Sequence, residues 1–154
     1  MSAPAAVRVR EAGVGDMDTL HALIRALASH EGQRAFVRCT PDDLRRDIAG
    51  PDPRFGALLA EVDARVAGFL TWTWLHSTWL GGRVMNIDDV FVLDDCRGRG
   101  AGEALMHAAH GAPRARGAPR LRWEVEADNA AAMRFYERLG ARMRTKGLFA
   151  WEAA

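Results

Sequence analysis

A strand that runs into a glycine-rich loop and then into a helix, between residues 84 and 109, restricts the possible folds of this chain more than any other feature. The strand, 84–93, is apolar on both faces apart from Asn86, Asp88 and Asp89, which is typical of a strand in the middle of a covered sheet. Glycines in the loop let main-chain N–H groups approach an anion closely, and the N-terminus of the following helix adds a favourable dipole. The segment therefore predicts a site for an anion such as a pyrophosphate.

Two better-known phosphate motifs are excluded in this loop. No Lys followed by Ser or Thr completes a P-loop, and Glu103 stands where a dinucleotide-binding fingerprint beginning at Gly98 requires its third glycine. A tight strand-to-helix turn that is merely rich in glycine is the alternative to an anion site, and the two arginines of the loop favour the anion. The loop residues are Arg97, Gly98, Arg99, Gly100, Ala101 and Gly102.

Patterns of apolar residues place strands and helices along the rest of the chain. Strand-like patterns predict a first strand from Val7 to near Gly13 and a hairpin of 57–62 with 66–75. They also predict a strand at 121–126 and two short C-terminal strands within 142–151. Helical spacing predicts helices at 17–27, closing near Gly32, and at 43–48, 104–109 and 129–139, the third stopped by Gly111 and Pro113. Without repeats or a linker, we expect one mixed α/β (α+β) domain, 1–154, around a single sheet.

Charge and cysteine content exclude several classes of function. Lys plus Arg number 21 against 20 Asp plus Glu, and the net charge of +1 carries no signature of binding to nucleic acid or to a membrane surface. No apolar run approaches the roughly 20 residues of a membrane-spanning helix. Two cysteines, no signal-peptide pattern and no histidine spacing typical of a metal site lead us to expect a reduced, cytoplasmic protein without a metal.

Asp88 and Asp89 stand inside an otherwise apolar strand. Adjacent side chains of a strand point to opposite faces, so at least one of these carboxylates should be largely buried. A buried carboxylate must be paired, hydrogen-bonded or open to a cleft. The pair therefore indicates either a functional site or a structural ion pair with an arginine, and the sequence leaves both open.

A tyrosine on the last predicted helix is a further candidate. Asp128 or Asn129 can cap this helix, and Ala132 and Tyr136 lie one turn apart on one face, so Tyr136 can point back across the sheet. A phenol stays protonated at neutral pH and can donate a proton to a leaving group. A core position with a satisfied hydroxyl is the alternative and, for any single tyrosine, the commoner one.

Together these features resemble the Gcn5-related N-acetyltransferase (GNAT) superfamily over nearly the whole chain. Its acetyl-coenzyme A motif, Arg or Gln, two residues, Gly, one residue, Gly or Ala, is matched by Arg97, Gly100 and Gly102. A later motif of the superfamily is matched by Asn129, Ala132, Phe135, Tyr136 and Gly140. The resemblance implies a central mixed, mostly antiparallel twisted sheet, about four helices on both faces, and a splay between two parallel strands that end near Val92 and Val125.

Within the superfamily the sequence is most similar to the spermidine/spermine, or diamine and thialysine, N-acetyltransferase branch. Residues 23–31 and 40–47 look like its first two helices, and 87–92 is similar to its acidic strand. Trp79 and Gly81 look like the Trp and Gly of its preceding hairpin.

The chain departs from that branch in three places. Asp88 replaces a Glu, so its carboxylate is one methylene further back and a bridging water becomes more necessary. His76, Ser77 and Thr78 stand where an acidic residue precedes the hairpin Trp, and His30 replaces a Tyr.

The resemblance implies acetyl-CoA as the cosubstrate and direct acetyl transfer to a primary amine of a small molecule: a polyamine, a diamine or a lysine-like amino acid. It assigns cosubstrate binding to Val90, Val92, Arg97, Gly98, Arg99, Gly100, Ala101, Gly102, Asn129 and Tyr136. It assigns substrate binding to Glu31, Asp88, Asp89 and Trp79. Asp88, through water, is the expected base and Tyr136 the acid for the departing thiolate, with Glu124 and Glu126 as rival bases.

The alternatives are acetylation of a protein N-terminus, a lysine side chain or an aminoglycoside, and a noncatalytic acetyl-CoA-binding module. A homodimer is expected by analogy. Four tryptophans, which can equally belong to the core, can supply its apolar area: Trp72, Trp74, Trp79 and Trp151.

Overall fold

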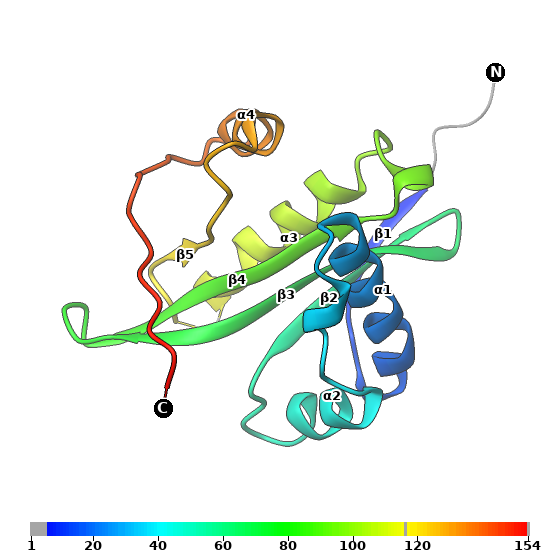
Figure 1. The fold of residues 1–154 in the computed structure, drawn as a ribbon, viewed down its shortest axis with the longest axis horizontal. Helices are drawn as coiled ribbons and strands as arrows, with labels where there is room; N and C mark the ends of the chain where they lie inside the picture. Colours follow the sequence, from blue (N-terminus) through cyan, green and yellow to red (C-terminus); the bar gives the residue numbers. More distant parts are fainter. Residues whose placement is uncertain (1–5, 116, 154) are drawn as a thin grey trace. The chain divides into compact units, whose positions relative to one another are not determined.

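The computed structural model describes residues 6–115 and 117–153 (Figure 1). The chain divides into two compact units, Met1–Trp123 and Glu124–Ala154, which are described separately. The expectation of a single domain over 1–154 therefore stays a prediction. None of the described helices is long and apolar enough to span a membrane.

The first unit is built around one five-stranded sheet in the order β1-β2-β3-β4-β5. Each strand from β1 to β4 pairs antiparallel with the next one, whereas β5 runs parallel to β4. The predicted mixed, mostly antiparallel sheet is thus confirmed. The strands are β1 (Val7–Glu11), β2 (Gly56–Val62), β3 (Arg65–Ser77), β4 (Gly82–Val92) and β5 (Leu121–Arg122).

Tight turns connect the central strands. Asp63 and Ala64 join β2 to β3 with φ of 51° and 65°, the left-handed pair of a two-residue turn whose twist matches that of the strands. Gly81, with φ of 63°, ends the turn between β3 and β4. Both hairpins follow the predicted order.

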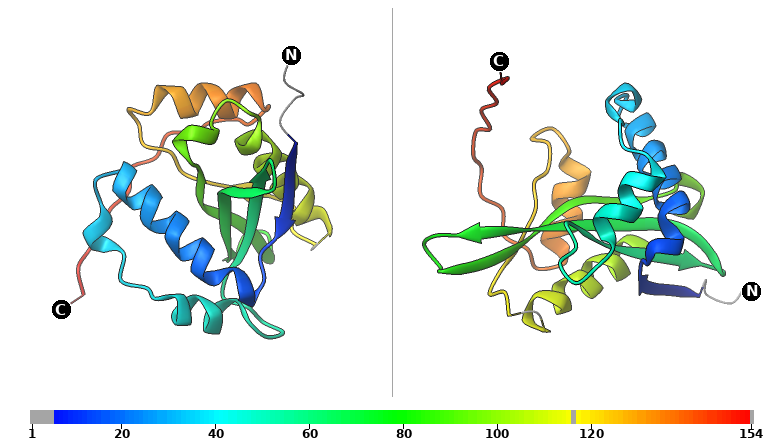
Figure 2. Two further views of the ribbon diagram at one scale, coloured as in Figure 1. Left: turned by 90° about the vertical axis from the view of Figure 1, so that its right-hand side faces the viewer. Right: turned by 90° about the horizontal axis from the view of Figure 1, so that it is seen from below.

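Helices cover both faces of this sheet. Figure 2 shows α1 (Met17–His30) and α2 (Pro41–Ile48) on one face and α3 (Ala101–Ala115) on the other. Met17, Leu20 and Leu23 of α1 are buried and share a core cluster with residues of β2, β3 and β4. On the opposite face α3 buries residues one turn apart, as an amphipathic helix should: Leu105, Met106 and Ala109.

The third predicted helix is longer than expected. It continues past Gly111 to Ala115, although Gly111 and Pro113 were expected to stop it. A glycine in a helix interior costs about 1 kcal/mol and a proline about 3 kcal/mol, so these two residues weaken the last turns of α3. The buried face of α3 supplies more stabilisation than these residues remove.

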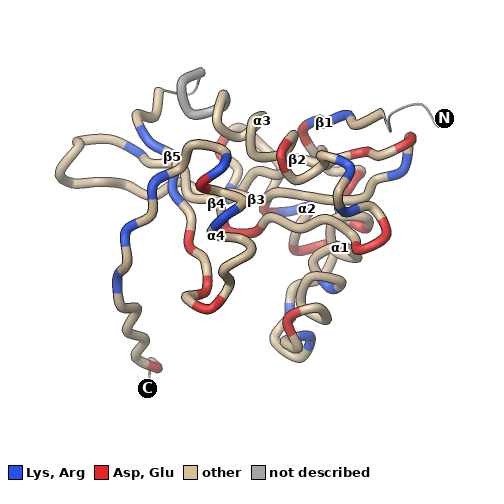
Figure 3. Tube along the Cα trace, turned by 90° about the horizontal axis from the view of Figure 1, so that it is seen from above, with Lys and Arg blue, Asp and Glu red and all other residues tan. Residues whose placement is uncertain are grey.

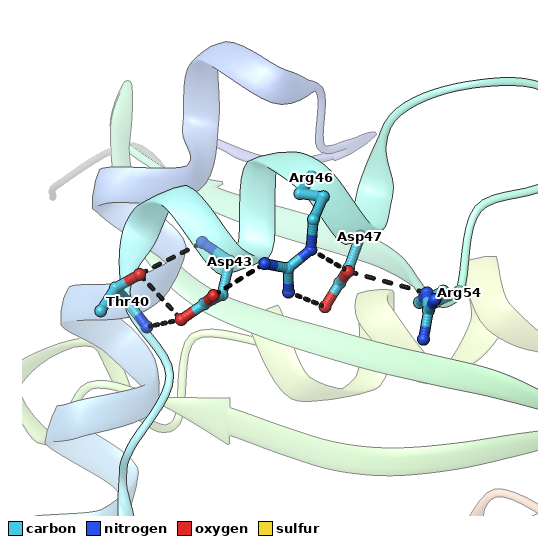
Figure 4. A network of polar contacts seen from close by, with 5 residues as sticks. All are labelled: Thr40, Asp43, Arg46, Asp47 and Arg54. Atoms are coloured by element: carbon cyan, nitrogen blue, oxygen red, sulfur yellow. Dashed lines mark hydrogen bonds and ion pairs between the residues drawn. The ribbon is translucent and has the colours of Figure 1, made fainter.

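A polar network at the exposed surface fixes the start of α2 (Figure 4). Thr40 N donates to Asp43 Oδ2 at 2.8 Å, and Asp43 N donates to Thr40 Oγ1 at 3.2 Å, and the two bonds form a reciprocal capping box. Arg46 then pairs with Asp43 and Asp47 at 3.0 Å each. Exposed pairs of this kind contribute little energy individually, so the cap does most to define where the helix begins.

The second unit contains α4 (Ala130–Arg138) followed by an extended segment. Asn129 Oδ1 accepts a hydrogen bond from Ala132 N at 3.1 Å, so Asn129 is the cap, and Gly140 ends the helix with φ of 90°.

Two strand predictions in the C-terminal part are wrong. Residues 141–153 form no strand, and only Leu121 and Arg122 of the strand predicted at 121–126 pair with a neighbour. Alternation specifies a strand only where another backbone supplies hydrogen bonds. Neither segment has such a partner along its full length among the described residues.

Candidate active site

A β-bulge in β4 sets the direction of the two aspartates. Thr71 of β3 pairs with Asp89, but the next residue, Trp72, pairs with Ile87, so Asp88 is the extra residue. The register shift breaks the alternation on which the sequence argument relied. The expectation that these adjacent side chains point to opposite faces is therefore wrong at this site.

Hydrogen bonds show that both carboxylates lie on one face. Asp88 Oδ1 accepts from Asn86 Nδ2 at 2.8 Å and from Thr73 Oγ1 at 3.4 Å. Asp89 Oδ2 accepts from Thr71 Oγ1 at 3.4 Å. Thr71 and Thr73 are two residues apart on β3 and so share a face, which is the face that α1 covers.

A third acid completes this group from another element. Glu31 caps the C-terminus of α1, and its negative charge raises the pKa of Asp89. We call Glu31, Asp88 and Asp89 the carboxylate cluster. None of the three forms an ion pair with a described Arg, Lys or His, so the structural ion pair that the sequence left open is not observed within the described residues.

Burial is the main cause of the altered acidity in the cluster. It raises the pKa of Asp88, while the hydrogen bonds from Thr73 and Asn86 lower it in part. It also raises the pKa of Asp89, to which the charges of Asp88 and Glu31 add. A carboxylate with a raised pKa is a better proton acceptor, and a group of unpaired acids favours a bound cation.

The edge of β4 opposite β3 is open for part of its length. β5 pairs with β4 only at Met85 and Asn86, whereas β4 runs on to Val92. Within the first unit, no described strand pairs with this edge beyond Asn86. An edge of this kind offers main-chain groups to an extended ligand, as in strand addition.

The glycine-rich loop turns the chain from β4 into α3. Gly98 and Gly100 have φ of 73° and 86°, the left-handed region that favours glycine, and α3 begins at Ala101. No heavy atom lies within 4 Å of an ideal Cβ at either glycine, so the space above the turn is open. Main-chain N–H groups of the first helical turn and an open approach fit an anionic group.

The two loop arginines are held by the protein itself. Arg97 pairs with Asp94 at 2.9 Å and donates from Nε to the carbonyl of Val92 at 3.1 Å. Arg99 pairs with Asp63 at 3.1 Å. Both pairs are exposed and therefore weak, but they show that the amides of the turn are the better-supported anion donors.

The other candidates on the first unit lie apart from the carboxylate cluster. Trp79 is 98% exposed in the turn beyond β3, whose last residue, Ser77, lies six residues past Thr71, the partner of Asp89. At about 3.3 Å per residue this is about 20 Å along the strand. Trp72 is only 3% exposed, so it belongs to the core and cannot supply area for a dimer. The substrate role of Trp79 stays a prediction.

The second unit carries the remaining predicted residues. Burial raises the pKa of Tyr136, whose ring meets Phe135 edge-on at 5.2 Å between centroids. The phenol is thus protonated at neutral pH, as proton donation requires. Asn129 is occupied as the cap of α4, and Glu124 and Glu126 are exposed. The roles of all four residues stay predictions.

Within the described ranges, no group of three or more His, Cys, Asp or Glu is arranged to hold a metal ion. Cys96 is buried beside the loop, and burial raises the pKa of Cys39. A raised pKa keeps Cys39 as the thiol, which is the poorer nucleophile.

Sequence reasoning missed the residues that hold the aspartates. Asn86 and Thr73 contact Asp88, and Thr71 contacts Asp89. The polar residues at 86 and 88 of an apolar strand, facing two threonines on the neighbouring strand, were the available signal. The sequence of β4 contains no feature that predicts the bulge.

An open strand edge that leads through a glycine turn to a helix N-terminus fits a ligand with an extended arm and an anionic group, and the carboxylates beside it, which have no ion-pair partner among the described residues, fit a cation. Residues 20–141 match the acetyltransferase (GNAT) family, and the chain belongs to that family. Members of this family use acetyl-CoA, and the chain is an acetyltransferase.

Relatives and solved structures agree with this assignment. The chain is 30% identical over 150 residues to the thialysine N-epsilon-acetyltransferase of Sus scrofa, covering 92% of this chain and 88% of that protein. It is 31% identical over 148 residues to the Bos taurus protein of the same name, covering 91% and 86%. An aminoglycoside acetyltransferase from an uncultured soil metagenomic sample, crystallised with trehalose, superposes with a TM-score of 0.82, 16% identity and 96% of each chain, which shows the shared fold.

Proposed function

We propose that this enzyme transfers the acetyl group of acetyl-CoA directly to a primary amine of a small molecule: a polyamine, a diamine or a lysine-like amino acid. The carboxylate cluster carries the proposal. Glu31, Asp88 and Asp89 have no described cationic partner, and an alkylammonium group would supply one. The thialysine N-epsilon-acetyltransferases, at about 30% identity, support an amine acceptor of this kind.

The open edge of β4 and the glycine turn fit the cosubstrate. Main-chain groups of Val90 and Val92 would bond the pantetheine arm, and the amides between Arg97 and Gly102 would hold the pyrophosphate. The cosubstrate supplies an acetyl group already activated as a thioester. Asn129 and Tyr136 complete the binding set on the strength of the family motif that they match.

Asp88 is the proposed proton acceptor. An alkylammonium has a pKa near that of lysine, about 10.4, so little of the amine is nucleophilic at pH 7. The carboxylate cluster concentrates the ammonium, and Asp88, fixed by Asn86 and Thr73, takes the proton through a water molecule as the amine attacks. Burial raises the pKa of Asp88, which strengthens it as a base.

Tyr136 is the proposed proton donor. As the C–N bond forms and the C–S bond breaks, the departing thiolate takes a proton from the phenol. The raised pKa of Tyr136 keeps that proton in place until the thiolate develops. Glu124 and Glu126 remain the rival bases, to be separated from Asp88 by mutation.

An acceptor panel tests the proposal. Free thiol released from acetyl-CoA is measured with polyamines, diamines, lysine analogues, peptides and an aminoglycoside, for the wild type and for Asp88→Asn. We expect turnover with small primary amines, and for Asp88→Asn a loss that is greatest at low pH, where unprotonated amine is scarcest. Preference for a peptide or an aminoglycoside, or equal pH profiles in the two proteins, contradicts the proposal.

A further inference from the structure

Two ion pairs connect the glycine-rich loop to residues 63–65, at the turn between β2 and β3. Arg65 Nη1 lies 2.7 Å from Asp95 Oδ2, and Arg99 Nη1 lies 3.1 Å from Asp63 Oδ2. Figure 1 shows this turn and the loop before α3 at the same end of the sheet. Each segment supplies one acidic and one basic side chain, so the two pairs have opposite polarity. We call them the turn–loop pairs.

The turn between β2 and β3 is itself fixed by neighbouring backbone. Asp63 N donates to the carbonyl oxygen of Ala6 at 3.1 Å, and Ala6 N donates to Asp63 Oδ1 at 3.3 Å. On the other side of the turn, Val62 of β2 pairs with Arg65 of β3 in the sheet. Asp63 therefore uses one carboxylate oxygen to anchor the turn and the other to hold Arg99, so the loop is tied to a rigid part of the fold.

Packing does not hold the centre of the loop. Gly98 and Gly100 adopt left-handed φ, and no described heavy atom lies within 4 Å of an ideal Cβ at either position. Glycine loses more conformational freedom than any other residue when its backbone is fixed. A ligand that must first order such a loop binds more weakly by the cost of ordering it. A contact that fixes Arg99, which stands between the two glycines, lowers this cost before the ligand arrives.

The charged side chains of the loop balance one another. Besides the turn–loop pairs, Arg97 pairs with Asp94 of the same loop at 2.9 Å. Figure 3 shows acidic and basic residues interspersed along the chain. The hydrogen bond from Arg65 lowers the pKa of Asp95, so this carboxylate is ionised at neutral pH. By charge alone Asp63 and Asp95 would repel a phosphate, and any gain in affinity from them must come from the geometry that they give the loop.

We propose that Asp63 and Arg65 are positioning residues for acetyl-CoA, which hold the glycine-rich loop in its binding shape without contacting the cosubstrate. The inference rests on the proposed function, since the pyrophosphate must bind to the amides between Arg97 and Gly102. Both turn–loop pairs are exposed, and an exposed pair of this kind changes an equilibrium constant by about 1.5- to fivefold. The affinity for coenzyme A should therefore depend on each pair to that extent.

The experiment measures the dissociation constant of coenzyme A by calorimetry for the wild type, Asp63→Asn, Asp95→Asn and Arg65→Gln. Asparagine adopts a left-handed φ readily and can still accept the hydrogen bond from Ala6 N, so Asp63→Asn removes little besides the charge. Asp94→Asn is the matched control, because it removes the same charge from the same loop and leaves both turn–loop pairs in place. Arg65→Asp combined with Asp95→Arg exchanges the two charges and can re-form the pair.

The direction of the change separates positioning from charge. Loss of a negative charge beside an anion site tightens binding by itself, as we expect for Asp94→Asn. Asp63→Asn and Asp95→Asn should instead weaken coenzyme A binding by about two- to fivefold each, and the charge exchange should restore the wild-type affinity. The kcat at saturating acetyl-CoA and the KM for the amine should not change, since the loop is ordered once the cosubstrate is bound. Tighter or unchanged binding in both variants, or equal weakening in Asp94→Asn, overturns the proposal.

Hydrogen exchange separates this inference from the proposed function. Amide exchange of residues 94–102 is followed by mass spectrometry in the free and the coenzyme A-bound proteins. We expect faster exchange in free Asp63→Asn and Asp95→Asn than in the free wild type, and equal protection once coenzyme A is bound. If coenzyme A leaves the wild-type loop unprotected, the proposed pyrophosphate site fails and the inference fails with it. If coenzyme A protects the loop but the free variants exchange like the wild type, the proposed site stands and only the inference is overturned.

Discussion

Replacing Asn86 by alanine tests whether the hydrogen bond to Asp88 tunes a proton acceptor. Asn86 Nδ2 donates to Asp88 Oδ1 at 2.8 Å, and this bond lowers the pKa of a carboxyl that burial raises. A bond to a charged group is worth about 1.5–3 kcal/mol, but Asp88 is only partly shielded from water, which replaces part of the bond and leaves about 1 kcal/mol. We therefore expect kcat/KM to fall about fivefold on the acid side of the pH profile, where a smaller fraction of Asp88 is then ionised.

The pH dependence of kcat/KM shows in which direction the pKa of Asp88 changes in Asn86→Ala. A carboxylate accepts a proton only while ionised, so activity falls as the pH drops through its pKa. Loss of the Asn86 bond raises the pKa of Asp88 further, so the acid limb of kcat/KM in Asn86→Ala should move to higher pH. Steady-state thiol release between pH 5 and 9 measures it.

Two comparisons make the test sharp. Thr73→Val removes only the 3.4 Å contact and should shift the limb less. In an Asp88→Asn background, Asn86→Ala should have almost no further effect, because the group that it tunes is gone. An unmoved acid limb in Asn86→Ala, or equal effects in both backgrounds, refutes the reasoning.

Three further substitutions test the proposed proton donor, the packing of the core and the stability of the fold at low pH. Tyr136→Phe should lower kcat about 10- to 1000-fold with little change in the acetyl-CoA dissociation constant, and an unchanged kcat would remove the phenol from the mechanism. Gly56→Ala would place a Cβ 2.1 Å from Trp72 Cζ2 and should reduce the free energy of unfolding in urea by about 1–3 kcal/mol; a neutral result would show that the indole moves freely. The Arg10 guanidinium lowers the pKa of Asp16 from 3.8 to about 2, so this pair stabilises the fold above pH 4 and the stability is lost as the pH falls towards 2. Thermal unfolding of Asp16→Asn should therefore depend less on pH in that window, and an unchanged dependence would contradict the assignment.

Features that depend on neighbours along the chain were accessible from the sequence. The hairpin of 57–62 with 66–75 and the glycine turn into α3 each involve residues a few positions apart, so local patterns predicted them. The family motifs around Arg97 and Asn129 are local in the same sense, and they led to the correct family.

Features that depend on the register between distant segments were decided only in the folded chain. The bulge that turns Asp88 and Asp89 to one face arises from the pairing of β3 with β4, and the approach of Glu31 to Asp89 from the packing of α1 on that face. The alternating C-terminal residues form no strand, because alternation requires a partner backbone to become a strand. The amino-acid sequence thus indicated which residues are candidates for the chemistry, and tertiary pairing decided which of them lie together, since side-chain direction in a sheet follows from registers that no local pattern encodes.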